Sequence, residues 1–288
     1  MLKIVEKTKI MFAISLLIII IGMGFMATKG LNLGIDFKGG TVLSISMNQE
    51  FKKVDMDKII DKHVKGEYVS KTIDDGKNFE ITVKSDALSA VETATMINDI
   101  TKTYKGSELS EQNTIGASVG NELKSKAILA LIVAIICMLV YIAFRFEFNF
   151  GVAAIIALVH DILITLGVYA VFQIPVNATF IAAILTIVGY SINDTIVVFD
   201  RIRENQKKMR KLSLDEITNT SISQTLARSI NTVATTLFTI AAVYVFVPTI
   251  RELSLPLMIG ILVGCYSSIF IASPSWVLLK KRKKKITA

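Results

Sequence analysis

The chain has 288 residues, of which 52% are hydrophobic, and it carries a formal net charge of +8. This composition indicates a membrane protein and excludes an ordinary soluble domain. With two cysteines in apolar runs and two histidines that lack metal-ligand spacing, the sequence offers neither a disulfide framework nor a metal framework.

The first apolar run, residues 10–28, is long enough to cross a bilayer, which takes about 20 residues. Lys3, Lys7 and Lys9 precede it, as basic residues precede the core of a signal peptide. The run is too long for an ordinary signal peptide, and no small-residue cleavage site follows it. We therefore expect residues 1–29 to hold a retained transmembrane helix behind a cytoplasmic N-terminal tail.

Residues 30–126 are expected to form an external domain. They contain thirteen Lys, no Arg and fifteen Asp or Glu, so this part of the chain is nearly neutral. Alternating and helical patterns follow one another in the order strand, helix, strand, strand, helix, strand. The strands are predicted at residues 41–47, 68–73, 79–84 and 108–118, and the helices at residues 54–64 and 88–104. This order predicts a ferredoxin-like α+β fold with a small core.

Five more apolar runs complete a polytopic α-helical membrane protein with six transmembrane helices. They are predicted at residues 127–144, 150–174, 178–199, 229–247 and 255–279. The five-helix bundle of residues 127–279 thus includes a basic cytoplasmic segment, residues 200–229, and a basic tail follows at residues 280–288. Short basic loops stay in the cytoplasm, so we expect both termini inside and residues 30–126 outside. The tail is best interpreted as a topology determinant or a contact for membrane lipids, with docking of a ribosome or cytosolic partner as the alternative.

A polar site interrupts the fourth apolar run. Its end reads GYSINDTIVVFD, with Asn193 and Asp194 side by side. A carboxylate in hydrocarbon costs at least about 2.5–3.5 kcal/mol, so such a residue is kept when a partner or a water path receives it. The site is therefore interpreted as protonatable and functional, and the alternative is an aspartate that joins helices by hydrogen bonding.

Arg228 is the candidate partner of Asp194. It precedes Thr232, Thr235 and Thr239 on one stripe of the fifth span, which indicates a helix face turned toward protein or water. Arg228 and Asp194 lie at compatible depths near the cytoplasmic side, so an ion pair between them is predicted. Protonation of Asp194 would break the pair, which makes it an element that a proton could drive. A static salt bridge is the alternative.

His160 and Asp161 form a second polar pair, near the middle of the third span. Adjacent helical residues point about 100° apart, so both side chains cannot face one site equally. The sequence leaves a role in a proton relay and a purely structural contact equally open.

Glycines mark two further positions. Gly34, Gly39 and Gly40 precede the first predicted strand, where they are expected to form a turn that aims the strand, or a hinge. Gly260 and Gly264 form a small-residue motif on the sixth span, which is typical of close helix packing.

These motifs together resemble the SecD/SecF family of membrane proteins that act in bacterial protein export, on its SecF side. The residues that carry the likeness are GIDFKGG at 34–40, VGNEL at 119–123, LVHD at 158–161, GYSINDTIVVFDRIREN at 189–205 and SQTLARSIN at 223–231. The likeness covers essentially the whole chain. Ala117 departs from the pattern, because relatives tend to have proline there, and this affects a local turn.

The resemblance implies one half of a resistance-nodulation-division transporter fold in the bacterial cytoplasmic membrane. It implies pairing with SecD, association with the SecYEG channel and with YajC/YidC-type membrane proteins, and contact with the translocating preprotein. It implies use of the proton motive force, after SecA has acted, to promote translocation and release. It implies no enzyme activity and no cofactor, with H⁺ as the coupling ion or Na⁺ as the alternative. Asp194 and Arg228, with Asn193, Asp161 and His160, are the residues onto which this coupling role maps.

Three other functions are compatible with parts of the sequence. An intramembrane aspartyl protease needs two carboxylates that share a proton, for which Asp161 and Asp194 are candidates, but its sequence signatures are absent. A small-molecule exporter half needs a larger external domain with a substrate pocket. A passive assembly factor for SecD, which handles no ions, is not excluded by the sequence.

Overall fold

The structure, a computed structural model, describes residues 3–64, 66, 68–73, 76–84 and 88–287. Six helical segments of the described chain are long and apolar enough to cross a membrane, which confirms the predicted number. The segments are Val5–Lys29, Ala117–Ile142, Phe148–Phe172, Ala178–Lys208, Leu214–Phe246 and Pro248–Arg282. The chain divides into two compact units: Met1–Asn32 with Leu129–Ala288, called here the membrane unit, and Leu33–Ile128, called the small unit.

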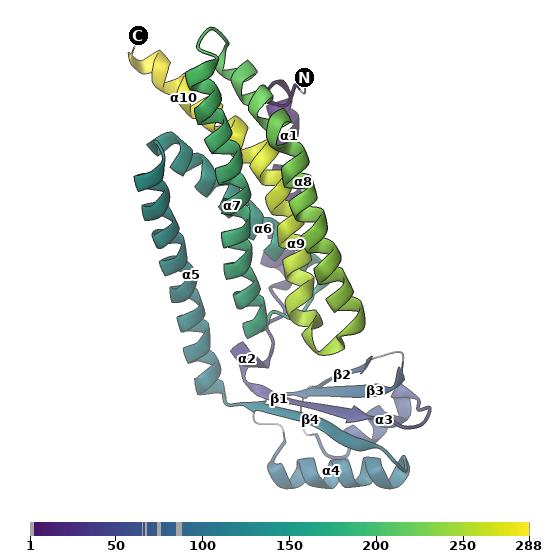
Figure 1. The fold of residues 1–288 in the computed structure, drawn as a ribbon. Coiled ribbons are helices and arrows are strands. Elements are labelled where there is room, and N and C mark those ends of the chain that lie inside the picture. The colour runs from purple at the N-terminus through teal and green to yellow at the C-terminus, as the bar shows by residue number, and fades with distance from the viewer. Residues whose placement is uncertain (1–2, 65, 67, 74–75, 85–87, 288) are drawn as a thin grey trace. The chain divides into compact units, whose positions relative to one another are not determined.

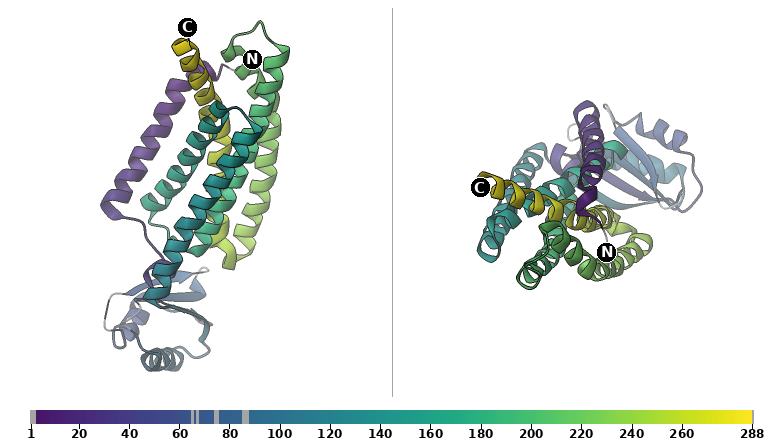
Figure 2. Two further views of the ribbon diagram at one scale, coloured as in Figure 1. Left: turned by 90° about the vertical axis from the view of Figure 1, so that its left-hand side faces the viewer. Right: turned by 90° about the horizontal axis from the view of Figure 1, so that it is seen from above.

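The membrane unit contains α1 (Thr8–Lys29), the second part of α5 (Ala117–Arg145), α6 (Phe148–Phe172), α7 (Ala178–Lys208), α8 (Leu214–Phe246), α9 (Arg251–Ser267) and α10 (Ser273–Thr287). α9 contacts α6, α7 and α8 and lies in the middle of these helices (Figure 2). In α6 and in the last membrane segment, about half of the most apolar stretch is buried inside the protein. In α1 and in α8 the buried share is 11%. The outer helices therefore leave most of their apolar surface for lipid or for another protein.

Small residues let the central helices approach closely. Gly260 and Gly264 on α9 face Ile187 and Ser191 on α7, as the small-residue motif predicts. A second close approach joins Gly22 on α1 to Gly167 on α6, where a Cβ added to Gly22 would lie 2.6 Å from the Gly167 Cα. This glycine pair has no sequence motif, because its members belong to different helices.

The last membrane segment is not a continuous α-helix. A π-helical turn, Ser268–Ala272, separates α9 from α10. Such a turn adds one residue and is frequent at functional sites. It carries Ser268, whose hydroxyl lies 2.9 Å from that of Thr195 on α7, next to Asp194.

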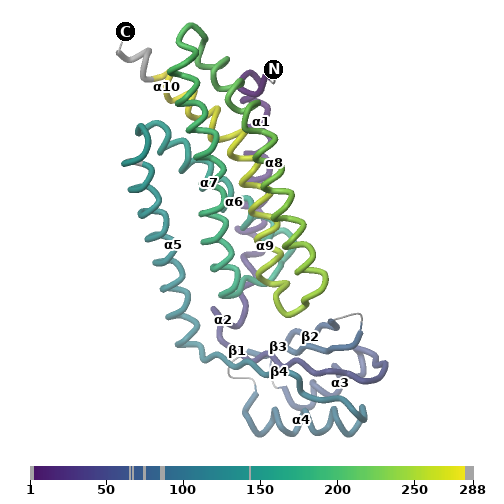
Figure 3. Tube along the Cα trace, in the orientation of Figure 1, coloured from purple at the N-terminus to yellow at the C-terminus, as the bar shows by residue number. Residues whose placement is uncertain are grey.

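The ends of α7 and α8 pack together beyond the apolar part of the chain. The predicted segment at 200–229 is helical over most of its length, since α7 runs on to Lys208 and α8 begins at Leu214 behind a capping box of Ser213 and Glu216. The N-terminal segment binds here too, because Asn219 on α8 accepts hydrogen bonds from the backbone N–H groups of Ile4 and Val5. Both chain ends lie at this end of the membrane unit (Figures 1 and 3).

The small unit is an α+β domain around one four-stranded antiparallel sheet (Figure 1). Its elements, in chain order, are α2 (Ile35–Lys38), β1 (Gly40–Ser46), α3 (Lys53–Ile60), β2 (Tyr68–Ile73), β3 (Asn78–Val83), α4 (Ala90–Thr103) and β4 (Glu108–Ile115), followed by the start of α5. The strands lie in the order β2-β3-β1-β4, and apart from the one-turn α2 the succession of strands and helices is the predicted one. This succession, with β1 and β3 in the centre of the sheet and β2 and β4 at its edges, is that of the ferredoxin-like arrangement.

Alternation along the strands builds the core of the small unit. Leu43 and Ile45 on β1 are fully buried, as are Phe79 and Ile81 on β3, and the residues between them are less buried. Strand side chains alternate between the two faces of a sheet, so one face receives these apolar groups and the helices cover it. Met96 of α4 is among the helix residues that complete this core.

Candidate functional site

The predicted polar site lies where α7 meets α8. Asp194 is partly buried, and its Oδ1 atom accepts a hydrogen bond of 2.6 Å from the Ser229 hydroxyl on α8. Its Oδ2 atom is buried and accepts no hydrogen bond of good geometry from the described residues, although the Ser268 hydroxyl of the π-helical turn lies near the carboxylate. A buried carboxylate oxygen without a partner is costly, so this oxygen is the place where a proton or a cation would bind most favourably.

Arg228 is adjacent to Asp194 but forms no ion pair with it in the described part of the chain. The predicted direct pair is thus not formed in this structure, in which Asp194 accepts a hydrogen bond from Ser229, the next residue of α8, instead. Arg228 lines a cavity of about 50 Å³ together with Asn193 and Asp194. The coupling role assigned to these residues stays a prediction.

Arg228 also lines a second, larger cavity. This cavity has a volume of about 330 Å³ and is lined by Asp200, Glu204 and Gln224 among others. Arg228 and Val197 are the residues that both cavities share. The larger cavity lies toward the ends of α7 and α8 that carry the basic segment, so Arg228 stands between this polar cavity and Asp194.

The polar stripe of α8 is largely exposed in the chain by itself. Thr235 and Thr239 donate hydrogen bonds back to carbonyls of their own helix, and Thr236 lies 2.6 Å from the Tyr190 hydroxyl of α7. Thr232, Thr235 and Thr239 are exposed, as is Asn193. The side chains of Thr232, Thr235 and Thr239 are therefore left uncovered by the described chain, although the composition of the stripe is that of a protein-facing helix.

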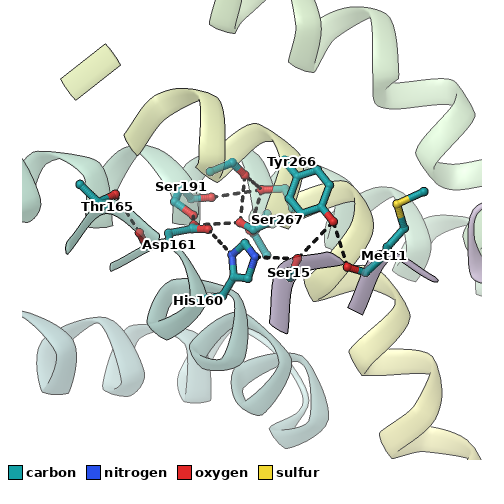
Figure 4. A network of polar contacts seen from close by, with 11 residues as sticks. Met11, Ser15, His160, Asp161, Thr165, Ser191, Tyr266 and Ser267 are labelled. Carbon is teal, nitrogen blue, oxygen red and sulfur yellow. Dashed lines mark hydrogen bonds and ion pairs between the residues drawn. The ribbon is translucent and has the colours of Figure 1, made fainter. Parts of the chain in front are cut away.

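His160 and Asp161 form a more closed site than the sequence suggests (Figure 4). Both are buried, and His160 Nδ1 lies 2.9 Å from Asp161 Oδ1. Asp161 Oδ2 accepts hydrogen bonds from Ser191 on α7 at 2.6 Å and from Ser267 on α9 at 2.8 Å. The carboxylate therefore connects three helices, and both of its oxygens have partners.

The imidazole extends this network to α1. His160 Nε2 lies 3.0 Å from the Ser15 hydroxyl, which lies 3.1 Å from the Tyr266 hydroxyl of α9. Tyr266 donates in turn to the backbone carbonyl of Met11. The side chains of His160 and Asp161 thus point in different directions, as expected for adjacent residues of a helix. His160 points toward α1 and Asp161 toward α7 and α9, and a hydrogen bond between them links the two sets of contacts.

The glycines before β1 lie in a tight connection. Gly34 has an ordinary φ of −69°, whereas Gly39 and Gly40 have positive φ values of 74° and 146°. A Cβ at Gly39 would lie 2.8 Å from the Ala117 Cα, and one at Gly40 would lie 2.6 Å from the Val83 carbonyl oxygen. These positions require glycine for both conformation and space, which supports a turn that aims the strand. A hinge at these glycines stays a prediction.

Sequence reasoning missed several polar partners of these sites. They are Ser15, Ser191, Ser229, Tyr266 and Ser267. Serine is common on membrane helices and usually bonds to its own backbone, so a single serine carries no signal. Its position opposite a buried carboxylate is known only once the helices are packed.

Comparison with known proteins agrees with this architecture. The family model described as "Protein export membrane protein SecD/SecF, C-terminal" matches residues 95–282, and that of the "SecD/SecF GG Motif" matches residues 24–50. The protein translocase subunit SecF of Sebaldella termitidis is 36% identical, over 98% of this chain and 93% of that protein. The SecF protein of Dictyoglomus turgidum is 41% identical, over 92% of each chain.

A solved structure shows the same fold. The crystal structure of SecDF, a translocon-associated membrane protein from Thermus thermophilus, matches with a TM-score of 0.88 and 34% identity, over 98% of this chain. The match covers 39% of the SecDF chain, so the present chain spans about two fifths of that protein's length. Fold, motif and sequence agree: the chain belongs to the SecD/SecF family of protein export membrane proteins, among its SecF members.

Proposed function

We propose that this chain works as a SecF-type subunit that couples an ion gradient across the bacterial cytoplasmic membrane to preprotein movement. The observation that carries the proposal is the free Oδ2 atom of Asp194 inside a membrane span. A carboxylate oxygen held out of water without a partner has a strong tendency to take up a proton or cation. Family membership supports protein export as the process that this uptake drives.

Arg228 is proposed as the group that responds to this uptake. It shares a cavity with Asp194 and a larger cavity with Asp200 and Glu204. When Asp194 is ionised, Arg228 is drawn toward it, and when Asp194 is neutral, Arg228 is drawn toward the two carboxylates of the larger cavity. Two alternative positions of Arg228 would give a bistable element that protonation can bias.

SecD is the proposed partner. The exposed polar stripe of α8 and the exposed Asn193 would be unfavourable in lipid, and a second bundle with a matching polar face would satisfy them. Transporters commonly build a site in the plane of the membrane between two related halves. The likeness to part of SecDF supports this pairing. The SecYEG channel and the preprotein are proposed as the further partners.

The positive-inside rule supports the proposed orientation. The basic residues after α7 and the basic C-terminal residues lie at one end of the membrane unit, together with the N-terminus. Both termini are then cytoplasmic, and the small unit is outside, where the translocated chain emerges. In this orientation the larger cavity beside Arg228 is reached from the cytoplasmic side.

The decisive variant is Asp194→Asn, which removes the charge and keeps the shape. The measurement is paired: abundance of the chain in the membrane, and gradient-dependent preprotein translocation into vesicles per folded complex at fixed ATP. We expect normal abundance and loss of the gradient-dependent part of translocation. Glu108→Gln, which neutralises an exposed carboxylate of the small unit, is the matched control and should leave both quantities unchanged.

A second variant, Arg228→Lys, and the separate use of proton and sodium gradients extend this test. Lysine keeps the charge but loses the planar fork of the guanidinium, so partial coupling is expected. Imposing the proton and sodium gradients one at a time identifies the coupling ion. If Asp194→Asn lowers abundance but leaves the specific activity normal, the carboxylate is a structural brace, the coupling proposal fails and the passive assembly role stands.

A further inference from the structure

The His160–Asp161 pair is not used by the proposed coupling site. Asp161 is 1% exposed and His160 is 5% exposed, near the middle of α6. The single ion-pair partner of Asp161 among the described residues is His160. A buried carboxylate without compensating charge is strongly unfavourable in a membrane span. The protonation of the pair therefore decides whether the middle of α6 carries a net charge.

The hydrogen-bond geometry allows the protons to be counted. Four contacts run in a chain: Asp161 to His160, His160 to Ser15, Ser15 to Tyr266, and Tyr266 to the Met11 carbonyl. Each contact needs one hydrogen between its two atoms. The two hydroxyls bring one hydrogen each, a neutral imidazole brings one, and an ionised carboxylate and a carbonyl bring none. Three hydrogens for four contacts leave one pair of oxygen or nitrogen lone pairs facing each other.

The same count holds if the imidazole ring is turned over, because a neutral ring has one N–H in either orientation. The Ser191 and Ser267 hydroxyls do not supply the missing hydrogen, since both donate to the other oxygen of Asp161. One added proton completes all four contacts. It also makes the pair neutral, either as carboxylate with imidazolium or as carboxylic acid with neutral imidazole.

We propose that His160 and Asp161 together bind one proton, forming a second intramembrane protonation site that is distinct from Asp194. This inference does not depend on the proposed function. The groups that face the pair are Ser15 from α1, Ser191 from α7, and Tyr266 and Ser267 from α9. Tyr266 is the single titratable group among these neighbours. No lysine, arginine or glutamate of the described chain forms an ion pair with either residue.

The His160–Asp161 site is hydrogen-bonded to α7, the helix that carries Asp194. Ser191, which donates to Asp161, lies on α7 three residues before Asp194, one turn away. Ser268, beside Ser267, contacts Thr195, the residue after Asp194. Loss of the bound proton would leave one contact of the chain unfilled and an uncompensated charge between α1, α7 and α9. The proton thus holds these helices together around α6.

The chain is well suited to a direct test, because His63 and His160 are its two histidines. The full-length chain with His63→Gln, labelled with ¹⁵N in the histidine ring and reconstituted in lipid vesicles, gives the signal of His160 by itself. The reciprocal His160→Gln chain identifies the signal of His63. Solid-state ¹⁵N spectra between about pH 5 and about pH 8, where an ordinary histidine titrates, report how many ring nitrogens carry hydrogen. Infrared spectra of the same samples report a protonated carboxyl group.

Two results support the proposal. In the first, both ring nitrogens carry hydrogen throughout the range. In the second, one ring nitrogen carries hydrogen, and a carboxylic acid band persists in Asp194→Asn but is lost in Asp161→Asn. One protonated nitrogen without such a band would overturn it, because the pair would then lack the extra proton. A second hydrogen that leaves the ring within this range without a carboxylic acid band appearing would overturn it equally. The ¹⁵N measurement leaves the site itself unaltered, so its outcome does not depend on whether Asp161→Asn folds. Loss of the carboxylic acid band in Asp161→Asn is scored in samples whose circular dichroism matches that of the unsubstituted chain.

Discussion

Gly22→Ala tests the packing that brings α1 to the His160 site. A Cβ at Gly22 would lie 2.6 Å from the Gly167 Cα, whereas ordinary van der Waals contact begins near 3.4 Å. The atom in the way is backbone, so no side-chain rotation relieves the clash, and the two helices must move apart by about 0.8 Å, the difference between those distances. Ser15 and His160 lie seven residues before Gly22 and Gly167, two turns away on the same faces.

Gly24→Ala provides the matched control. The same substitution two residues along α1 meets nothing within 4 Å. Both changes raise helix propensity by the same amount, up to about 1 kcal/mol, so this gain cancels when the two variants are compared. The overpacking cost at Gly22 does not cancel and is about 1–3 kcal/mol. Gly22→Ala should therefore have a free energy of unfolding lower than that of Gly24→Ala by about 1–3 kcal/mol.

Reversible unfolding in mixed micelles, followed by circular dichroism, measures this difference. In the same samples the contact of 3.0 Å between Ser15 and His160 should lengthen, which the ¹⁵N signal of His160 reports. Equal stability of the Gly22→Ala and Gly24→Ala chains would refute the close approach of α1 to α6 and, with it, the membership of Ser15 in the buried network.

Two further predictions concern the small unit and the N-terminal segment. Leu43→Ala leaves a cavity at a fully buried position and should lower the free energy of unfolding of the small unit by about 2–5 kcal/mol. The control, Val91→Ala, changes a residue that is 77% exposed and should alter this free energy by less than about 0.5 kcal/mol. Thermal unfolding of the two variants measures the difference, and equal stability would contradict the prediction. Asn219→Ala removes the acceptor of two N-terminal backbone N–H groups and should speed their hydrogen exchange by roughly fivefold, as expected for a lost cap of about 1 kcal/mol. Ser223→Ala, which removes a hydroxyl bonded to the Asn219 carbonyl of the same helix, is the control, and equal exchange in both variants would show that Asn219 does not hold the segment.

The membrane spans and the small sheet could be predicted from the sequence because both depend on local patterns. In lipid every backbone polar group must be satisfied within the segment, so a long apolar run has to be a helix. Alternation along residues 41–47 and 79–84 fixes which side chains of a strand face the core. The boundaries were less accurate: α7 continues to Lys208 and α8 begins at Leu214, since polar helices can extend beyond the bilayer when they pack on each other.

Asp194 could be identified from the sequence because a carboxylate in an apolar run is a chemical anomaly that needs no neighbours to be recognised. Its partner could not be identified. The sequence favours Arg228 by charge, but the structure places the Ser229 hydroxyl on Oδ1 and leaves Oδ2 free. A rotation of one residue along a helix turns a side chain by about 100°, and helix rotation is set by packing rather than by local pattern.

The sequence by itself thus determined the number of spans, the fold of the small unit and the presence of two intramembrane carboxylates. The tertiary structure decided what surrounds those carboxylates. Ser15 and His160 are separated by 145 residues in the chain, as are Gly22 and Gly167, and neither member of either pair is unusual for a membrane helix. These residues come into contact only where α1 packs against α6, because hydrogen bonds and close contacts depend on distances in space that the packed helices establish.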